Sequence, residues 1–168
     1  MPMDTRSLRS LSLSTIALAR QFGVRITAEQ LEEKIARGQV SSTRELSKTF
    51  NEQGIKLQLL KPNLKTLTSR SYYFPCVALL RDGTSKILIN CSQNSEGAFE
   101  FQSIDPLDPS NKVAVEKEDE FKKTWNGSVY LVSRETGVSS QDRIFDWTWF
   151  IPEIYRFKGL LGLTFIAA

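Results

Sequence analysis

The pattern of hydrophobic and polar positions changes along the chain and predicts helices first and strands afterwards. Three helices with one apolar face each, followed by a short alternating strand, are predicted over residues 10–22, 28–37, 43–53 and 55–60. Gly23 is a natural stop for the first helix. Thr27 predicts an N-cap for the second helix, and Ser41 or Ser42 predicts one for the third.

After Pro62 the period shortens, and runs of aromatic and β-branched residues predict strands. These runs cover residues 72–80, 85–91, 98–104 and 127–133, with a charged helix over 116–125 before the last of them. The pair Asp82-Gly83 between two hydrophobic runs predicts a hairpin turn. Helices followed by antiparallel strands indicate an α+β domain in which N-terminal helices pack on an antiparallel sheet.

Composition narrows the possible functions. The 168 residues suit one domain, and a net charge of +3 from 22 basic and 19 acidic residues, without a basic stripe, argues against a nucleic-acid partner. The chain has no histidine, which excludes Ser-His-Asp and Cys-His catalysis and histidine-dependent zinc sites. Cys76 and Cys91 lie in apolar runs and indicate core positions in a reducing cytoplasm. We expect no metal and no cofactor, because metal-ligand clusters and a phosphate-binding P-loop are missing.

The last segment, residues 145–168, is rich in aromatic residues and ends in ten positions without a charge. Ten residues of helix span only about 15 Å, so this stretch predicts the beginning of a transmembrane helix from Pro152 onwards. Four side chains suit a membrane–water interface: Trp147, Trp149, Phe150 and Tyr155. The alternative is an amphipathic helix that packs on the sheet or on a partner. The predicted boundaries are 5–138 for the domain, 139–151 for a linker with an aromatic elbow, and 152–168 for the membrane helix.

The order of these elements, the Asp-Gly turn and the segment FDWTWFIPEIYRFK resemble the N-terminal domain of type I secretion ABC exporters, the haemolysin type in particular. The tail segment is the specific part of the resemblance, and the remainder matches by pattern over nearly the whole chain. The resemblance implies a papain-like fold. In the bacteriocin-exporting branch of the family, this domain is a cysteine peptidase that cuts a leader after a double glycine.

The family's catalytic positions are occupied by other residue types in this chain. The cysteine position falls on Ser10, or on Leu11 with a shift of one, and the histidine position falls on Ser85. The aspartate position falls on Asp105, and the glutamine that would help form the oxyanion hole falls on Asp4. The resemblance therefore implies degenerate positions and a domain that is not an enzyme.

Ser10 has two further interpretations. As a residue near the start of a predicted helix it suits an N-cap. As a nucleophile it would need a base, and a dyad with Lys86 is the one alternative that the sequence offers for an active leader peptidase. Lys86 is otherwise expected to be a solvated lysine on an outward strand position.

The resemblance implies a domain that holds an unfolded RTX-type substrate near the export channel, on the cytoplasmic face of the bacterial inner membrane. Its partners would be the secreted substrate, the exporter's membrane and ATPase domains, and the membrane itself. Candidate substrate contacts are Tyr72, Tyr73 and Trp125, for which core packing is the alternative. A free-standing soluble interaction protein is the remaining alternative for the chain as a whole.

Overall fold

The computed structural model describes residues 4–24, 26–110 and 112–134. Their six strands form one antiparallel sheet in the order β1-β6-β2-β3-β4-β5. The strands are β1 (Ile55–Leu60), β2 (Cys76–Leu80), β3 (Ser85–Gln93), β4 (Phe99–Ile104), β5 (Val113–Lys117) and β6 (Trp125–Arg134). The α+β class and the antiparallel sheet predicted from the sequence are confirmed.

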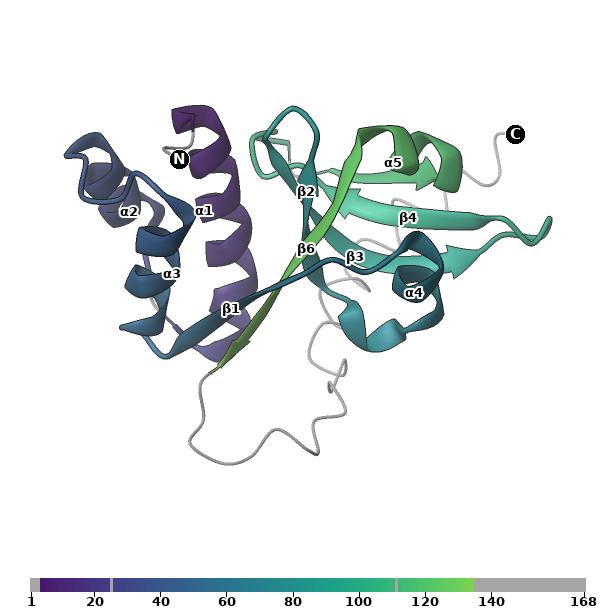
Figure 1. Cartoon of the computed structure of the whole chain (residues 1–168), viewed down its shortest axis with the longest axis horizontal. Helices are drawn as coiled ribbons and strands as arrows, with labels where there is room; N and C mark the ends of the chain where they lie inside the picture. The colour runs from purple at the N-terminus through teal and green to yellow at the C-terminus, as the bar shows by residue number, and fades with distance from the viewer. Residues whose placement is uncertain (1–3, 25, 111, 135–168) are drawn as a thin grey trace. The chain divides into compact units, whose positions relative to one another are not determined.

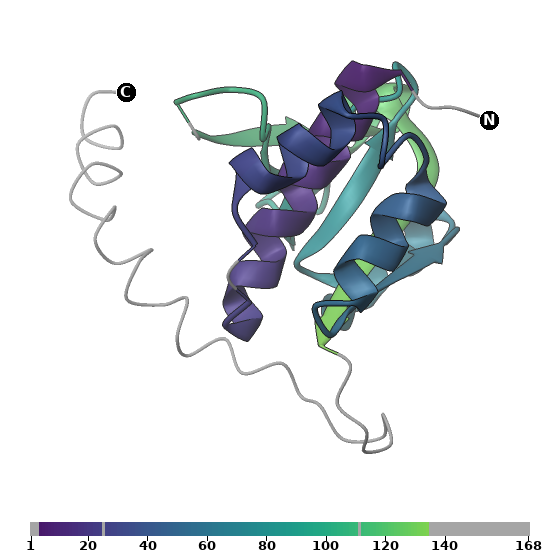
Figure 2. The same cartoon turned by 90° about the vertical axis from the view of Figure 1, so that its left-hand side faces the viewer.

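The helices surround this sheet. They are α1 (Thr5–Ala19), α2 (Ala28–Ala36), α3 (Thr43–Asn51), α4 (Leu64–Ser69) and α5 (Glu118–Thr124), with short 3₁₀ turns η1 (Arg20–Phe22) and η2 (Ser71–Tyr73). Figure 1 shows α1, α2 and α3 together on one side of the sheet, with α4 and α5 towards the other end. Figure 2 is viewed from the side of α1, α2 and α3, and these three helices lie in front of the strands.

The predicted caps of the second and third helices are confirmed. The hydroxyl of Thr27 accepts a hydrogen bond from the Gln30 amide at 3.3 Å, and the hydroxyl of Ser42 accepts one from the Glu45 amide, also at 3.3 Å. Each bond satisfies one of the amides that a helix leaves unpaired in its first turn. The prediction for the first helix is wrong at its start, because α1 begins at Thr5 and has Asp4 at its N-cap.

Two layers of apolar side chains hold the sheet between the helices. On the α1 side, buried residues from the three N-terminal helices meet Ile55, Val77, Ile87 and Tyr130 of the strands. On the α5 side, three aromatic rings stack in sequence: Phe101 lies 4.3 Å from Phe121, and Phe121 lies 5.4 Å from Trp125, centroid to centroid. Helices are thus required on both faces to keep these side chains from water.

The predicted hairpin at Asp82-Gly83 joins β2 to β3 and is confirmed. Gly83 has a φ of +86°, a conformation that residues with a Cβ rarely adopt. The carboxylate of Asp82 accepts hydrogen bonds from the amide and the hydroxyl of Thr84, at 2.9 and 2.7 Å. These bonds hold the pKa of Asp82 below its ordinary value, because they favour the charged form.

None of the helices in the described part of the chain is both long enough and apolar enough to cross a membrane. The predicted aromatic elbow and membrane helix lie outside the described residues.

Candidate functional site

Three buried hydroxyl groups meet where α1 crosses β3. Ser10 and Ser14 are four residues apart, which places them on the same face of the helix. Ser85 is the first residue of β3. Their exposed fractions are 0%, 0% and 1%, so water does not reach them. This is where the sequence places the family's cysteine and histidine positions.

The three side chains form a closed hydrogen-bond network. The hydroxyl of Ser10 accepts a bond from the Ser85 amide at 2.9 Å and lies 3.1 Å from both the Ser85 carbonyl and the Ser85 hydroxyl. The Ser14 hydroxyl lies 3.0 Å from the Ser85 hydroxyl. Because a hydroxyl both donates and accepts, the set is self-sufficient. Among the described residues no buried side-chain polar atom is without a hydrogen-bond partner.

This position also corrects the capping role predicted for Ser10. The residue lies inside α1, past its first turn, and its hydroxyl is directed to a strand 75 residues away in the chain. Two neighbours in the same helix behave differently: Ser12 donates to the Leu8 carbonyl at 2.7 Å, and Thr15 donates to the Leu11 carbonyl at 2.8 Å. Ser10 therefore serves the helix–sheet contact and not the helix end.

The tip of the β2–β3 hairpin fixes the start of β3 against α1. A Cβ added at Gly83 would lie 2.5 Å from the Ser7 hydroxyl, which is closer than real Cβ contacts come. The backbone of the turn therefore approaches the helix as only glycine allows, and Ser85 enters the strand two residues later.

Lys86 lies on the opposite face of β3 from Ser85, because successive strand residues alternate. Its ammonium is paired with the carboxylate of Glu116 on β5, which also accepts a bond from the Ser103 hydroxyl at 3.1 Å. The side chains of Lys86 and Glu116 are 22% and 16% exposed. The expectation of a solvated lysine is thus wrong, and the Ser10–Lys86 dyad is not formed.

The remaining predicted site residues are scattered. Asp105 is exposed at the end of β4, where its carboxylate accepts a bond from the Leu107 amide at 2.9 Å. Within the described ranges no hydrogen bond joins it to Ser10 or Ser85. The structure brings Ser10 and Ser85 together, and the assignment of Ser10, Ser85 and Asp105 to the family's catalytic positions stays a prediction.

The predicted aromatic contacts lie mostly inside the fold. Tyr73 is buried, and Trp125 is buried with its indole N–H donating to the Ser128 carbonyl at 2.9 Å. Their rings are therefore part of the core in this structure. The Tyr72 side chain lies outside what the structure describes, as do the predicted membrane-interface residues Trp147, Trp149, Phe150 and Tyr155.

Both cysteine thiols have a raised pKa. Cys76 is fully buried, and burial raises the pKa of its thiol well above the ordinary value. Burial, together with the negative charge of Glu118, raises the pKa of Cys91 to about 11. Across the described part of the chain, no cluster of three or more His, Cys, Asp or Glu side chains could hold a metal ion.

One strand with an exposed apolar surface, the edge strand β5, was not predicted from the sequence. Val113 and Val115 are 53% and 59% exposed, although both are large apolar side chains in a strand. The strand is the last in the sheet order and pairs with β4 on one side. The signal was present as alternation in the run KVAVEK, but it is short and merges into the charged helix that follows.

Comparison with known proteins identifies the family. Residues 4–137 match the peptidase C39 family. The chain is 23% identical to the leukotoxin export ATP-binding protein LtxB of Aggregatibacter actinomycetemcomitans, over 99% of this chain and 23% of that protein. It is 25% identical to the cyclolysin secretion/processing ATP-binding protein CyaB of Bordetella pertussis, over 89% of this chain and 20% of that protein. The chain thus spans a quarter or less of the curated relatives it matches.

Among solved structures, the fold is similar to that of a double glycine motif protease from an AMS/PCAT transporter, determined in complex with the leader peptide. The two share 14% sequence identity and a TM-score of 0.59, over 79% of this chain and 89% of the other. The resemblance to exporter N-terminal domains noted from the sequence is confirmed by these matches.

The comparisons also overturn one expectation. From its degenerate positions the domain was expected not to be an enzyme, but the family that it matches is a family of peptidases, and the solved relative is a protease. With a match over residues 4–137 and a shared fold, the chain belongs to the peptidase C39 family.

Proposed function

We propose that this chain is the peptidase C39 domain of a protein exporter and that it recognises an extended segment of the exported polypeptide. Two relatives are named for toxin export or secretion, and a solved relative holds a leader peptide. In this proposal the exported polypeptide is an unfolded RTX-type protein. The partners are the membrane and ATPase parts of the exporter, and the domain lies on the cytoplasmic face of the inner membrane.

The observation that carries the proposal is the free edge of β5. An edge strand presents main-chain N–H and C=O groups without partners on its outer side, and an extended peptide can pair with them as an added strand. β5 is a short edge strand of five residues, and two of them, Val113 and Val115, expose apolar side chains. Adjacent exposed apolar side chains beside an open strand edge favour a surface that is covered by a partner.

The register of the sheet supports this use of the edge. Ile87 pairs with Ile104, and Ile104 pairs with Val113, so the three side chains share one face of the sheet. Ile87 belongs to the core under α1, and Ile104 packs against that core while partly exposed. The apolar surface thus continues from the core to the open edge. In a strand added to β5, every second side chain would lie on the same face and continue this apolar surface.

Export of a substrate by the whole exporter tests this proposal. We expect Val115→Glu to reduce the amount of secreted polypeptide by about tenfold, because a charge on the docking strand opposes strand addition. The matched control is Leu59→Glu, which places the same charge on β1, the opposite edge strand, at a side chain that is 46% exposed. Equal secretion from the two variants, at equal exporter levels, would refute the role of β5.

We further propose that the described domain is a papain-like body and that the aromatic tail attaches it to the membrane. Trp147, Trp149, Phe150 and Tyr155 have the amphipathic rings that favour the membrane interface. A chain cut after residue 138 should remain in the soluble fraction of a cell lysate, while the 168-residue chain should sediment with membranes. Identical fractionation of the two chains would contradict the attachment.

A further inference from the structure

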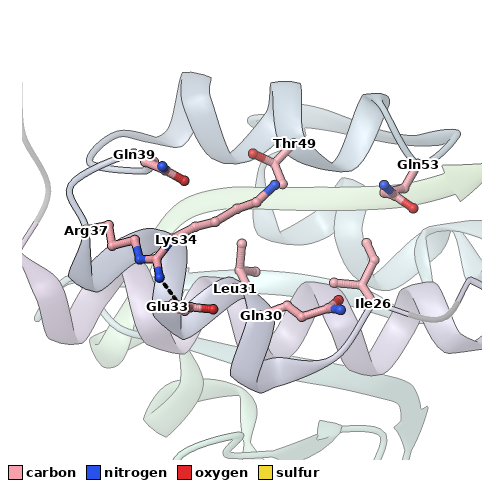
Figure 3. Close-up of a pocket in the computed structure, with 9 residues that line it drawn as sticks. All are labelled: Ile26, Gln30, Leu31, Glu33, Lys34, Arg37, Gln39, Thr49 and Gln53. Atoms are coloured by element: carbon pink, nitrogen blue, oxygen red, sulfur yellow. Dashed lines mark hydrogen bonds and ion pairs between the residues drawn. The ribbon is translucent and has the colours of Figure 1, made fainter.

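A groove between α2 and α3 is lined mainly by polar side chains. Its volume is about 380 Å³. Figure 3 shows Gln39 and Gln53 at the two ends of the groove and Gln30 on its α2 side. Beneath them the floor is apolar, formed by Leu31, which is 2% exposed, and Ile26. A groove with amide groups on its rim and an apolar floor has the character of a peptide-binding surface.

The charges in this groove do not cancel. The lining contains one acid, Glu33, and its carboxylate is paired with the guanidinium of Arg37 one turn later. Lys34 is the third charged residue of the lining, and within the described ranges its ammonium has no ion pair. Figure 3 shows its side chain reaching from α2 across the groove towards Thr49 on α3. The groove therefore carries one uncompensated positive charge.

The kind of anion follows from the donors that are available. Arginine binds phosphate through a fork of parallel N–H groups, and Arg37 is already engaged by Glu33. Glu33 compensates the charge of Arg37, so the one uncompensated cation is the Lys34 ammonium, which suits one carboxylate. The carboxamides of Gln30, Gln39 and Gln53 each offer a donor and an acceptor, as a peptide group does.

We propose that this groove binds a carboxylate-bearing residue of an extended polypeptide, with Lys34 bound to the carboxylate and the glutamines bound to the neighbouring main chain. This inference rests on the proposed function, that the domain recognises extended polypeptide. It adds a second point of contact with a defined preference, an aspartate or glutamate side chain. The groove is separate from β5, because α3 packs against β1, at the opposite edge of the sheet.

The test is a titration of the ¹⁵N-labelled 168-residue chain, followed through its amide resonances. The probes are a soluble glycine-serine peptide with one central aspartate, the same peptide with asparagine, a valine-rich peptide directed at β5, and acetate alone. We expect the aspartate peptide to shift resonances of α2 and α3. Its affinity should fall by about fivefold or more with Lys34→Gln or with the asparagine peptide, because a charge-assisted hydrogen bond is lost.

The matched control is Lys65→Gln, which removes the same charge from an exposed position on α4. It should bind the aspartate peptide like the unchanged chain. Equal affinity of Lys34→Gln and the unchanged chain would overturn the assignment of Lys34, and equal binding of acetate and peptide would overturn the polypeptide as ligand. A valine-rich peptide that shifts β5, while the aspartate peptide leaves α2 and α3 unmoved, would overturn this inference alone. If no peptide shifts any resonance, both the inference and the proposed function fail.

Discussion

The side-chain oxygen of Ser10 on α1 lies 2.9 Å from the backbone nitrogen of Ser85 on β3, in a region that water does not reach. One helix residue thus satisfies the backbone of a strand that begins 75 residues later. Since a buried amide without a partner is costly, this bond makes the α1–β3 contact specific in position as well as favourable.

Ser10→Ala should lower the free energy of unfolding by about 1–3 kcal/mol, because the Ser85 amide then stays buried without an acceptor. Urea denaturation measures this loss. Ser12→Ala is the control: Ser12 is also buried in α1, but its hydroxyl donates to the Leu8 carbonyl of the same helix. Its replacement should cost less than about 0.5 kcal/mol. If both variants lose a similar free energy of unfolding, the hydrogen bond between Ser10 and β3 contributes no more than a bond within the helix.

Gly83→Ala should destabilise the chain by about 2 kcal/mol or more, because the new methyl group meets the Ser7 hydroxyl and the residue keeps a positive φ. Gly38→Ala is the matched control, with a φ of +71° and nothing within 4 Å of the added Cβ. Its cost should be the backbone term alone, about 1 kcal/mol. Adding Ser7→Ala to Gly83→Ala should recover the difference in thermal denaturation. If it does not, the close approach is not the cause.

The Lys86–Glu116 pair should contribute a coupling energy of about 1–2 kcal/mol in a double-mutant cycle, because both side chains are largely shielded from water. The exposed Arg37–Glu33 pair on α2 is the comparison, with side chains 65% and 59% exposed. It should contribute about 0.3–0.5 kcal/mol. A coupling of the same size in both pairs would contradict the role assigned to burial.

The thiols should react slowly with iodoacetamide at neutral pH, and Cys91 should react before Cys76, which is fully buried. Burial raises the pKa of Cys91 from 9.0 to about 11, so the folded chain keeps the thiol neutral where the unfolded chain would ionise it. Its contribution to stability is therefore complete below about pH 9 and is lost as the pH rises towards 11. Mass spectrometry of the alkylated chain identifies each site, with Cys91→Ser as the control. Faster labelling of Cys76 would contradict the burial.

The elements that could be predicted from the sequence are those with local signals. The caps at Thr27 and Ser42 bond to amides three residues away, and the hairpin at Asp82-Gly83 is determined by its own turn chemistry. Such contacts are encoded within a few residues, so a pattern search finds them.

The elements that were missed depend on distant partners. β5 has only a short run of alternating residues, and its position is set by pairing with β4. The six-residue helix α4, capped by Asn63, is too short to show an apolar face. The same holds for the site: a serine in SLRSLSLST can cap a helix or face a sheet, and only the fold brings Ser10 to Ser85.

The position of β6 also determines how the domain would respond to mechanical load. This last described strand runs between β1 and β2, is antiparallel to both, and ends with Arg134 opposite Ile55. A force applied at Arg134 along the axis of β6 would load the hydrogen bonds to β1 and to β2 in shear. An edge strand has a ladder on one side only, and a force perpendicular to it breaks the hydrogen bonds of that ladder one after another. Because β6 is paired on both sides, separating it from the sheet breaks two ladders, whereas separating β1 or β5 breaks one.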